Sequence, residues 1–331
     1  MKITVLGAGA WGTAFGQVLA DAGNEVTMWA KEPEIVEGIR TNHRNHVRLP
    51  FIERLPDAMT ATGDRAEAVR DAEIVVVAIA AQFARIALEG FKDLIPDDAI
   101  VVSLMKGIER NTNKRMDEVV RESLDLPAER FAAISGPNLS KEIALRQPSA
   151  TVVGCTNLDN ATKVAKACTT DYFKAFVTTD VIGLEMCGSL KNVVALAVGM
   201  ARGAGYGENT AAMIETRGLA ELTALGQAAG ADPKTFAGLA GVGDLIATCG
   251  SPLSRNYTFG ANLGKGLTVE EATKVSNGVA EGVPTTDAVV ALGDQLHVPT
   301  PLAYAMSHVL HEGISCEQML GELFGTEITA E

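Results

Sequence analysis

Basic residues are scarce in this chain, and their shortage narrows the ligands that it can bind. Lys and Arg total 28 against 41 Asp and Glu, so the formal net charge at pH 7 is -13. A chain this negative repels nucleic acid and anionic membrane surfaces. We therefore expect no nucleic-acid partner. We also expect any anionic ligand to be captured locally, by the few basic side chains beside glycine-rich or helix-starting segments.

Several other signals are missing. Apolar stretches such as 193–201 are shorter than the ~20 residues that span a bilayer, and Met1 leads into a strand-like run without a signal-peptide pattern. The five cysteines include no CxxC pair, and the five histidines lack metal-ligand spacing. Hydrolase, zinc-protease and P-loop motifs are absent as well. These absences predict a cytoplasmic protein with reduced, mostly buried thiols, no metal centre and no integral membrane contact.

The distribution of β-branched residues predicts two domains of different class. At 331 residues the chain exceeds the ~250 to 300 residues that one hydrophobic core usually serves. Up to about residue 180, helical stretches alternate with the runs ITVLG, EVTMW, EIVVVAIA, AIVVSLM, FAAIS, ATVVG and KAFVTT. Such alternation is typical of an α/β fold with a mostly parallel sheet. We expect this domain over 1–181 and an all-helical domain over 182–331.

A glycine motif identifies the ligand of the first domain. Gly7-x-Gly9-x-x-Gly12 follows the strand KITVL and opens a predicted helix, which is the context of a Rossmann-type dinucleotide site. The first glycine permits the turn, the second admits the pyrophosphate, and the third packs helix against strand. The polar stretch TNHRNHVRLPFIERLP, with two Leu-Pro pairs, predicts an ordered surface excursion near the cofactor.

The end of the second strand bears on the choice of cofactor. NAD enzymes commonly carry a carboxylate there, but here the strand ends in Ala30 and Lys31. Lys31 could meet a 2′-phosphate, which favours NADP, while the neighbouring Glu32 keeps NAD open. An ordinary solvated loop lysine is the alternative interpretation.

Two lysines are candidates for the chemistry. Hydride transfer to a ketone creates an alkoxide, which needs a proton donor and an electrostatic partner. Lys106 follows the strand AIVVSLM at the carboxyl edge of the sheet, where ligands bind in open α/β folds. Lys191 lies in an apolar helical segment with Gly188 and Ala195 on its face. The alternatives are a flexible loop lysine and a snorkelling surface lysine.

The segment AGVGDLIATCGSPLSRN supplies further polar groups. Ser254 can cap a helix that starts with Arg255, and that helix start offers an anion site of the kind a phosphate needs. Asp244 could bind substrate hydroxyls, hold Lys191, or form a structural salt bridge with Arg255.

With these segments in order, the chain resembles the bacterial NAD(P)-dependent glycerol-3-phosphate dehydrogenases nearly end to end. The resemblance is carried by VLGAGAWGTAF, NHRNHVRLP, SLMKGIE, ISGPNLSKEIA, GSLKNVVALAVGMARGAGYGENTAAMIETRGLAEL, AGVGDLIATC with SRN, and GVAEGVPT. It implies reduction of dihydroxyacetone phosphate to sn-glycerol 3-phosphate, a phospholipid precursor, in the cytoplasm. Members of the family often form homodimers.

The resemblance also implies roles for matching residues. Lys191 corresponds to the proton-transferring lysine, and Lys106 to one shared between cofactor and substrate. The other implied substrate contacts are Gly136, Asn138, Asp244, Ser254, Arg255 and Asn256. The implied cofactor contacts, beyond Gly7, Gly9, Gly12 and Lys106, are Ala10, Trp11, Lys31, Ser140, Arg255, Val279 and Glu281.

The chain departs from the family pattern at a few positions. Ala10 stands where Ser is frequent, and Lys31 where Arg or His is commoner. ISGPNLSKE replaces a pattern of Thr or Ser followed by Phe-Ala, so Asn138 and Ser140 could contact ligands through backbone or side chain. Two alternatives remain: another two-domain Rossmann dehydrogenase, of the 3-hydroxyacyl-CoA or 6-phosphogluconate type, or a noncatalytic NAD(P)H sensor. The two lysines and Asp244 favour an enzyme over the sensor.

Overall fold

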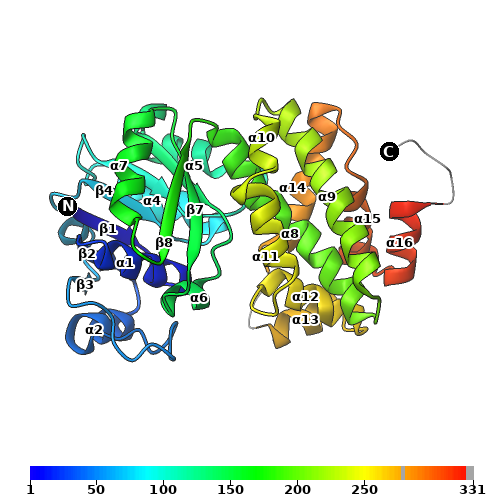
Figure 1. Ribbon diagram of the computed structural model, residues 1–331, viewed down its shortest axis with the longest axis horizontal. Coiled ribbons are helices and arrows are strands. Elements are labelled where there is room, and N and C mark those ends of the chain that lie inside the picture. Colours follow the sequence, from blue (N-terminus) through cyan, green and yellow to red (C-terminus); the bar gives the residue numbers. More distant parts are fainter. Residues whose placement is uncertain (277–279, 326–331) are drawn as a thin grey trace. The chain divides into compact units, whose positions relative to one another are not determined.

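The computed structural model describes residues 1–276 and 280–325. These residues form two compact units (Figure 1). Unit 1 comprises 1–109 and 114–185, and unit 2 comprises 110–113 and the described residues from 186 onward. The change from one unit to the other falls inside helix α8 (Val181–Gly203).

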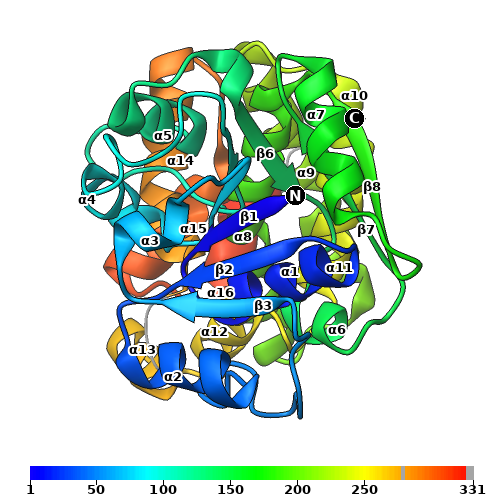
Figure 2. The ribbon, with the colours of Figure 1, turned by 90° about the vertical axis from the view of Figure 1, so that its left-hand side faces the viewer.

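Unit 1 is built on one eight-stranded sheet with the order β3-β2-β1-β4-β5-β6-β7-β8. Its strands are β1 (Lys2–Leu6), β2 (Glu25–Trp29), β3 (Met59–Thr62), β4 (Ile74–Val77), β5 (Ile100–Ser103), β6 (Phe131–Ser135), β7 (Ser149–Gly154) and β8 (Phe173–Thr178). All neighbours are parallel except β6 and β7. The mostly parallel sheet is therefore confirmed, and Figure 2 shows β1, β2 and β3 side by side.

The seven predicted β runs omitted one strand. The edge strand β3 consists of MTAT, which has no continuous apolar run to mark it. Only Met59 and Ala61 give it apolar side chains, and both are buried. It forms because β2 offers a free edge in register with it, a tertiary condition that the local sequence does not encode.

Helices cover the sheet and account for its apolar strands. They are α1 (Ala10–Asp21), α2 (Pro33–Asn42), α3 (Arg65–Val69), α4 (Ala84–Glu89), α5 (Met116–Leu124), α6 (Ser140–Ala144) and α7 (Leu158–Cys168). In β4, Ile74 and Val76 join the core cluster that contains α1 and α7 residues, while Val75 and Val77 are equally buried but lie outside that cluster. Both faces of β4 are thus covered, which explains the absence of a two-residue period.

The described part of unit 2 contains helices and no strand, so the helical second half is confirmed. Its elements after α8 are α9 (Glu208–Ala228), α10 (Pro233–Phe236), a π-helical turn (Leu239–Gly243), α11 (Asp244–Cys249), α12 (Arg255–Gly264), α13 (Val269–Val275), α14 (Gly282–Leu296), α15 (Pro301–Glu312) and α16 (Cys316–Phe324). All five cysteines are buried, in agreement with the expectation of mostly buried thiols.

Helix α8 is a longer apolar segment than the sequence analysis recognised. At 23 residues it is long and apolar enough, by length and composition, to cross a membrane, although the run 193–201 on its own is too short. The sequence analysis missed this helix because Glu185 and Lys191 interrupt its run of apolar residues. Of its most apolar window, 94% is buried inside the structure, as in the core helix of a globular protein.

Candidate active site

The glycine turn between β1 and α1 contains two glycines that close packing requires and a third, Gly9, that leaves open space. A Cβ atom on Gly7, where φ is 112°, would lie 2.6 Å from the carbonyl oxygen of Ala78. One on Gly12 would lie 2.2 Å from the carbonyl oxygen of Gly7. A Cβ on Gly9 would meet nothing within 4 Å. Gly7 and Gly12 therefore hold strand, turn and helix together, whereas Gly9 forms an open floor that a ligand can approach.

A cavity of about 330 Å³ opens above this floor. Its lining includes the last residue of β2, residues 30–32 after it and, from the β4 side, Ile79, Phe83, Ile86 and Ala87. Phe83 and Ile86 are 66% and 71% exposed, unusually bare for large apolar side chains. Phe83 belongs to the short 3-10 helix η1 (Ala81–Phe83). A flat apolar group such as a nucleobase would cover both side chains.

The donors around the turn also fit a dinucleotide. The indole Nε1 of Trp11 is buried and has no hydrogen-bond partner among the described residues. The N-cap residue of α1, Gly9, has no side chain to satisfy the first backbone N–H groups of the helix. Buried donors without partners are costly, and free N–H groups at a helix N-terminus bind phosphate. The residues present therefore suit the pyrophosphate of NAD or NADP.

The polar excursion after α2 is pinned to the glycine turn. Asn45 Nδ2 donates to the carbonyl oxygen of Ala8 at 3.0 Å and to Thr13 Oγ1 at 2.8 Å. This anchor brings Arg48 into the cavity lining together with Lys31. Arg48 is ion-paired with Glu32 at 3.6 Å. Sequence reasoning missed Arg48, although a basic residue inside the predicted excursion was a usable signal.

Lys106 is held rather than loose. β5 ends at Ser103, slightly earlier than predicted, and Lys106 Nζ donates to the carbonyl oxygen of Gly136, just beyond β6, at 3.2 Å. The structure thus brings together two residues chosen from separate motifs. This contact favours a held lysine over a flexible loop lysine.

Asn138 is engaged by strand β7. Its Nδ2 donates to the carbonyl oxygen of Ala150 at 3.1 Å, and its Oδ1 accepts from Thr151 Oγ1 at 2.9 Å. Both ends of the amide are therefore used within unit 1, which leaves the backbone of this loop for ligand contact. Ser140 is the first residue of α6.

Unit 2 contains a buried ion pair. Lys191 Nζ, on α8, donates to Asp244 Oδ1 and, at 2.6 Å, to Thr248 Oγ1. The side chains of Lys191 and Asp244 are only 7% and 2% exposed. Lys191 is therefore no snorkelling surface residue, and Asp244 holds Lys191. Thr248 was missed by sequence reasoning, although its spacing four residues after Asp244 on one helix face could have found it.

The register between α8 and α12 is set by close glycine packing. A Cβ on Gly260 would lie 2.0 Å from the carbonyl oxygen of Leu196, and one on Gly264 would lie 2.0 Å from that of Met200. Only glycine allows the two backbones this near. One turn earlier, Asn256 Nδ2 donates to Asn192 Oδ1 at 2.8 Å. The start of α12 is thereby placed beside the residue that follows Lys191.

The start of α12 has the form of an anion site. Ser254 is its N-cap and accepts from Tyr257 N at 3.2 Å, and Arg255 is its exposed first residue. Asn256 Oδ1 accepts from Gly282 N at 2.9 Å, which ties this turn to the start of α14. Helix N–H groups and a guanidinium together suit a phosphate.

Glu281 adjoins the same turn. Burial raises the pKa of its carboxyl, and Arg255 and Arg110 oppose that rise. Its Oε2 is buried with no hydrogen-bond partner in the described part of the chain. Val279, the other residue chosen in that loop, lies outside the described residues. Among those residues, no group of three His, Cys, Asp or Glu side chains could hold a metal ion.

A mostly parallel sheet with a dinucleotide turn, followed by a helical unit that contains a buried lysine, defines a two-unit nicotinamide-dependent dehydrogenase. Comparison with known proteins specifies the family. Models of the N-terminus and the C-terminus of NAD-dependent glycerol-3-phosphate dehydrogenase match residues 2–161 and 180–321. The chain belongs to this family.

Individual relatives agree over the full length. The chain is 87% identical over 330 residues to glycerol-3-phosphate dehydrogenase (NAD(P)+) of Bifidobacterium longum strain NCC 2705, covering 100% of this chain and 99% of the relative. Identity to the corresponding protein of Corynebacterium jeikeium strain K411 is 49% over 332 residues, with 100% of both chains covered. The crystal structure of glycerol-3-phosphate dehydrogenase from Coxiella burnetii superposes with a TM-score of 0.92 at 31% identity, covering 98% of this chain and 99% of the other.

Proposed function

We propose that this chain is an NAD(P)-dependent sn-glycerol-3-phosphate dehydrogenase that reduces dihydroxyacetone phosphate to sn-glycerol 3-phosphate. The observation that carries the proposal is the full-length relationship to enzymes of that name, in a chain that retains the buried Lys191–Asp244 pair. Residues 1–181 act as the dinucleotide-binding domain and residues 182–331 as the substrate-binding domain.

In this proposal the residues around the glycine turn of unit 1 form the main part of the cofactor site. Gly7, Gly9 and Gly12 with Ala10 and Trp11 hold the pyrophosphate region, and Lys31 holds the adenosine end. Lys106, Ser140, Arg255, Val279 and Glu281 complete the proposed contacts. When bound, NADPH or NADH supplies the hydride for the carbonyl carbon.

Lys191 supplies the proton. As the carbonyl carbon gains hydride, its oxygen becomes an alkoxide that must gain a proton, and an ammonium group is both donor and electrostatic partner. Asp244 and Thr248 fix the position of Lys191 Nζ through the hydrogen bonds described above. Burial of the group excludes water that would compete for the same proton.

The phosphate and hydroxyl groups of the substrate have their own proposed contacts. Arg255, with the first N–H groups of α12, binds the phosphate as a charge-assisted donor set. Ser254 and Asn256 support that turn. Gly136, Asn138 and Lys106 contribute from unit 1, with Asn138 acting through its backbone because its side chain is engaged by β7.

The assay that tests the proposal measures NADPH oxidation at 340 nm with dihydroxyacetone phosphate, alongside acetoacetyl-CoA and, in the reverse direction, 6-phosphogluconate with NADP. We expect turnover with dihydroxyacetone phosphate alone. Lys191→Ala should abolish turnover and leave NADPH binding largely intact, since Lys191 acts on the alkoxide. Tight NADPH binding without turnover by the unaltered protein would favour a sensor. Loss of NADPH binding in a Lys191→Ala variant that circular dichroism shows to be folded would contradict the proposed role.

Cofactor preference is a second, separable part of the proposal. Lys31 and Arg48 line the cavity together with Glu32, which pairs with Arg48 at 3.6 Å. A 2′-phosphate would therefore meet Lys31 and compete with Glu32 for Arg48, and we favour NADPH on the contribution of Lys31. Lys31→Glu should raise the KM for NADPH by about tenfold or more, because a cation beside the 2′-phosphate is replaced by a carboxylate that repels it, and should leave the KM for NADH nearly unchanged. Arg54→Glu alters a cation of the same excursion that does not line the cavity and serves as control. An unchanged preference in Lys31→Glu removes Lys31 from the account.

We also infer that the enzyme works in the cytoplasm as a homodimer without membrane contact, and that its product supplies phospholipid synthesis. The burial of α8 supports the absence of membrane contact. Sedimentation of the purified protein, with and without vesicles, measures both the subunit number and membrane association.

A further inference from the structure

The segment that carries Lys106 has a defined shape. We call residues 104–115, between β5 and α5, the Lys106 hairpin. Its two arms are joined where Glu109 N donates to the carbonyl oxygen of Lys114 at 2.9 Å. The hairpin can set the position of Lys106 only if contacts with other parts of the protein hold its two arms in place.

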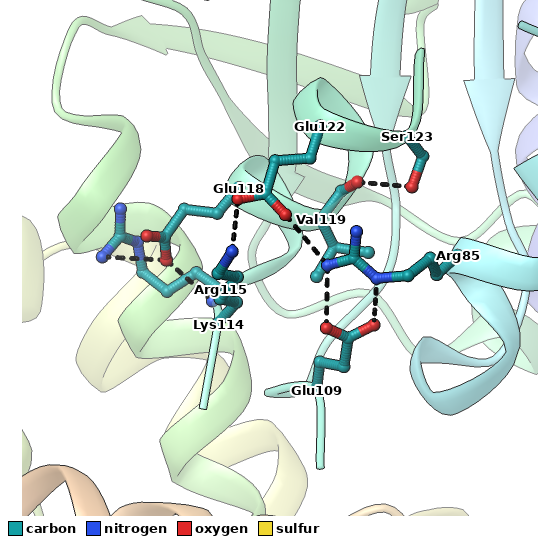
Figure 3. A network of polar contacts seen from close by, with 8 residues as sticks. All are labelled: Arg85, Glu109, Lys114, Arg115, Glu118, Val119, Glu122 and Ser123. Carbon is teal, nitrogen blue, oxygen red and sulfur yellow. Dashed lines mark hydrogen bonds and ion pairs between the residues drawn. The ribbon is translucent and has the colours of Figure 1, made fainter. Parts of the chain in front are cut away.

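Arg85, on α4, grips this hairpin from outside. Its Nε and Nη2 donate to the two carboxylate oxygens of Glu109, each at 2.9 Å, and Nη2 also donates to Glu122 Oε2 on α5 at 3.1 Å (Figure 3). Lys114, on the other arm, donates to the second oxygen of Glu122. The side chain of Glu109 is only 13% exposed. A bidentate, partly buried pair is stronger and more directional than an ordinary surface ion pair.

The same short segment forms part of the cofactor cavity. Phe83 and Ile86, on either side of Arg85 in the chain, line the cavity above the glycine turn. Gln82 Nε2 donates to the carbonyl oxygen of Ile108, inside the hairpin, at 2.8 Å. Two side chains of residues 82–86 therefore face the cavity, and two others hold the Lys106 hairpin.

We propose that Arg85 is a positioning residue, which fixes the Lys106 hairpin to the wall of the cofactor cavity through Glu109 and thereby sets where Lys106 Nζ stands. This inference rests on the proposed function, because that function assigns Lys106 to cofactor and substrate. Lys106 Nζ meets the carbonyl oxygen of Gly136 at 3.2 Å, at the end of a long side chain. Such a side chain stays in place only if its backbone does.

The test is a double-mutant cycle between Arg85→Gln and Lys106→Gln in the full-length enzyme. We expect Arg85→Gln to raise the KM for dihydroxyacetone phosphate about tenfold, and less than about twofold when Lys106 is already replaced, because coupled residues are not additive. The same double-mutant cycle is also measured on the dissociation constant for NADPH, by fluorescence titration, which does not depend on turnover. Glu109→Gln should reproduce Arg85→Gln, and Arg85→Lys should restore part of the loss, since lysine keeps the charge without the bidentate contact.

A matched control removes a comparable pair elsewhere in unit 1. Lys163 pairs with Glu73 at 3.2 Å, and neither residue touches the cavity or the hairpin. Lys163→Gln should leave both constants within about twofold, as for an exposed pair. Thermal unfolding of every variant shows whether it is folded. If Arg85→Gln does not fold, Glu109→Gln and Arg85→Lys replace it in the double-mutant cycle with Lys106→Gln.

Two results overturn the inference. One is an Arg85→Gln enzyme with unchanged constants, and the other is an equal loss with and without Lys106, which marks Arg85 as structural only. A wild-type protein without activity on dihydroxyacetone phosphate would instead overturn the proposed function, so the two failures are distinguishable.

Discussion

Removing the negative charge at position 244 should destabilise unit 2 strongly. Asp244→Asn keeps the size of the side chain but leaves the buried Lys191 ammonium without its counter-charge. Removing one partner of a buried pair costs about 3 to 5 kcal/mol. The lower end applies here, because Thr248 Oγ1 still accepts from Lys191 Nζ at 2.6 Å and the new amide oxygen can accept as well. At ~2 to 4 °C per kcal/mol for a region of this size, about 3 kcal/mol corresponds to a fall in Tm of roughly 6 to 12 °C.

The assay is thermal and urea unfolding of the ligand-free enzyme, followed by circular dichroism. Asp287→Asn is the matched control, since Asp287 pairs with His311 on the surface of the same unit, and an exposed pair is worth at most about 1 kcal/mol. Adding Lys191→Met to Asp244→Asn should restore stability, because the uncompensated charge is then gone.

Two outcomes would refute this reasoning. If Asp244→Asn unfolds within about a degree of the wild type, the charge of Asp244 does not hold Lys191 in place. If the double variant is no more stable than Asp244→Asn, the loss does not arise from an unpaired ammonium.

Two further predictions concern unit 2. Gly260→Ala places a Cβ atom 2.0 Å from the carbonyl oxygen of Leu196 and should cost about 1 to 3 kcal/mol or more in urea unfolding through overpacking. Gly321→Ala, with open space at its Cβ, should be neutral or slightly stabilising, and equal costs at the two positions would contradict the packing argument. Burial raises the pKa of the Glu221 carboxyl to about 7, above the ordinary 4.5, despite two backbone N–H donors from α15. The folded state then binds the proton more tightly than the unfolded state, so this contribution to stability is present below pH 4.5 and is lost as the pH rises towards 7. Glu221→Gln should remove that fall in the unfolding midpoint, and identical pH slopes in both proteins would show that Glu221 does not titrate in this range.

Local patterns in the sequence determined much of this protein. A dinucleotide-binding turn is specified by a β-strand pattern, followed by Gly7, Gly9 and Gly12 and an amphipathic helix. This pattern is readable because turn geometry and side-chain periodicity depend on a few neighbouring residues. The cap of α12 by Ser254 was readable for the same reason. The loss of β-branched runs after about residue 180 indicated that the second half is helical. The resemblance of whole motifs pointed to the family.

Only the tertiary structure decided how distant side chains meet. Lys191 and Asp244 lie 53 positions apart, and their pairing depends on how α8 and α11 pack. Strand β3 formed because β2 offered an edge, and Arg48 reached the cavity because Asn45 anchors its segment to the glycine turn. The bidentate contact of Arg85 with Glu109 likewise joins α4 to the hairpin that follows β5. Such contacts depend on packing between elements, whereas sequence periodicity reports only which face of each element is apolar.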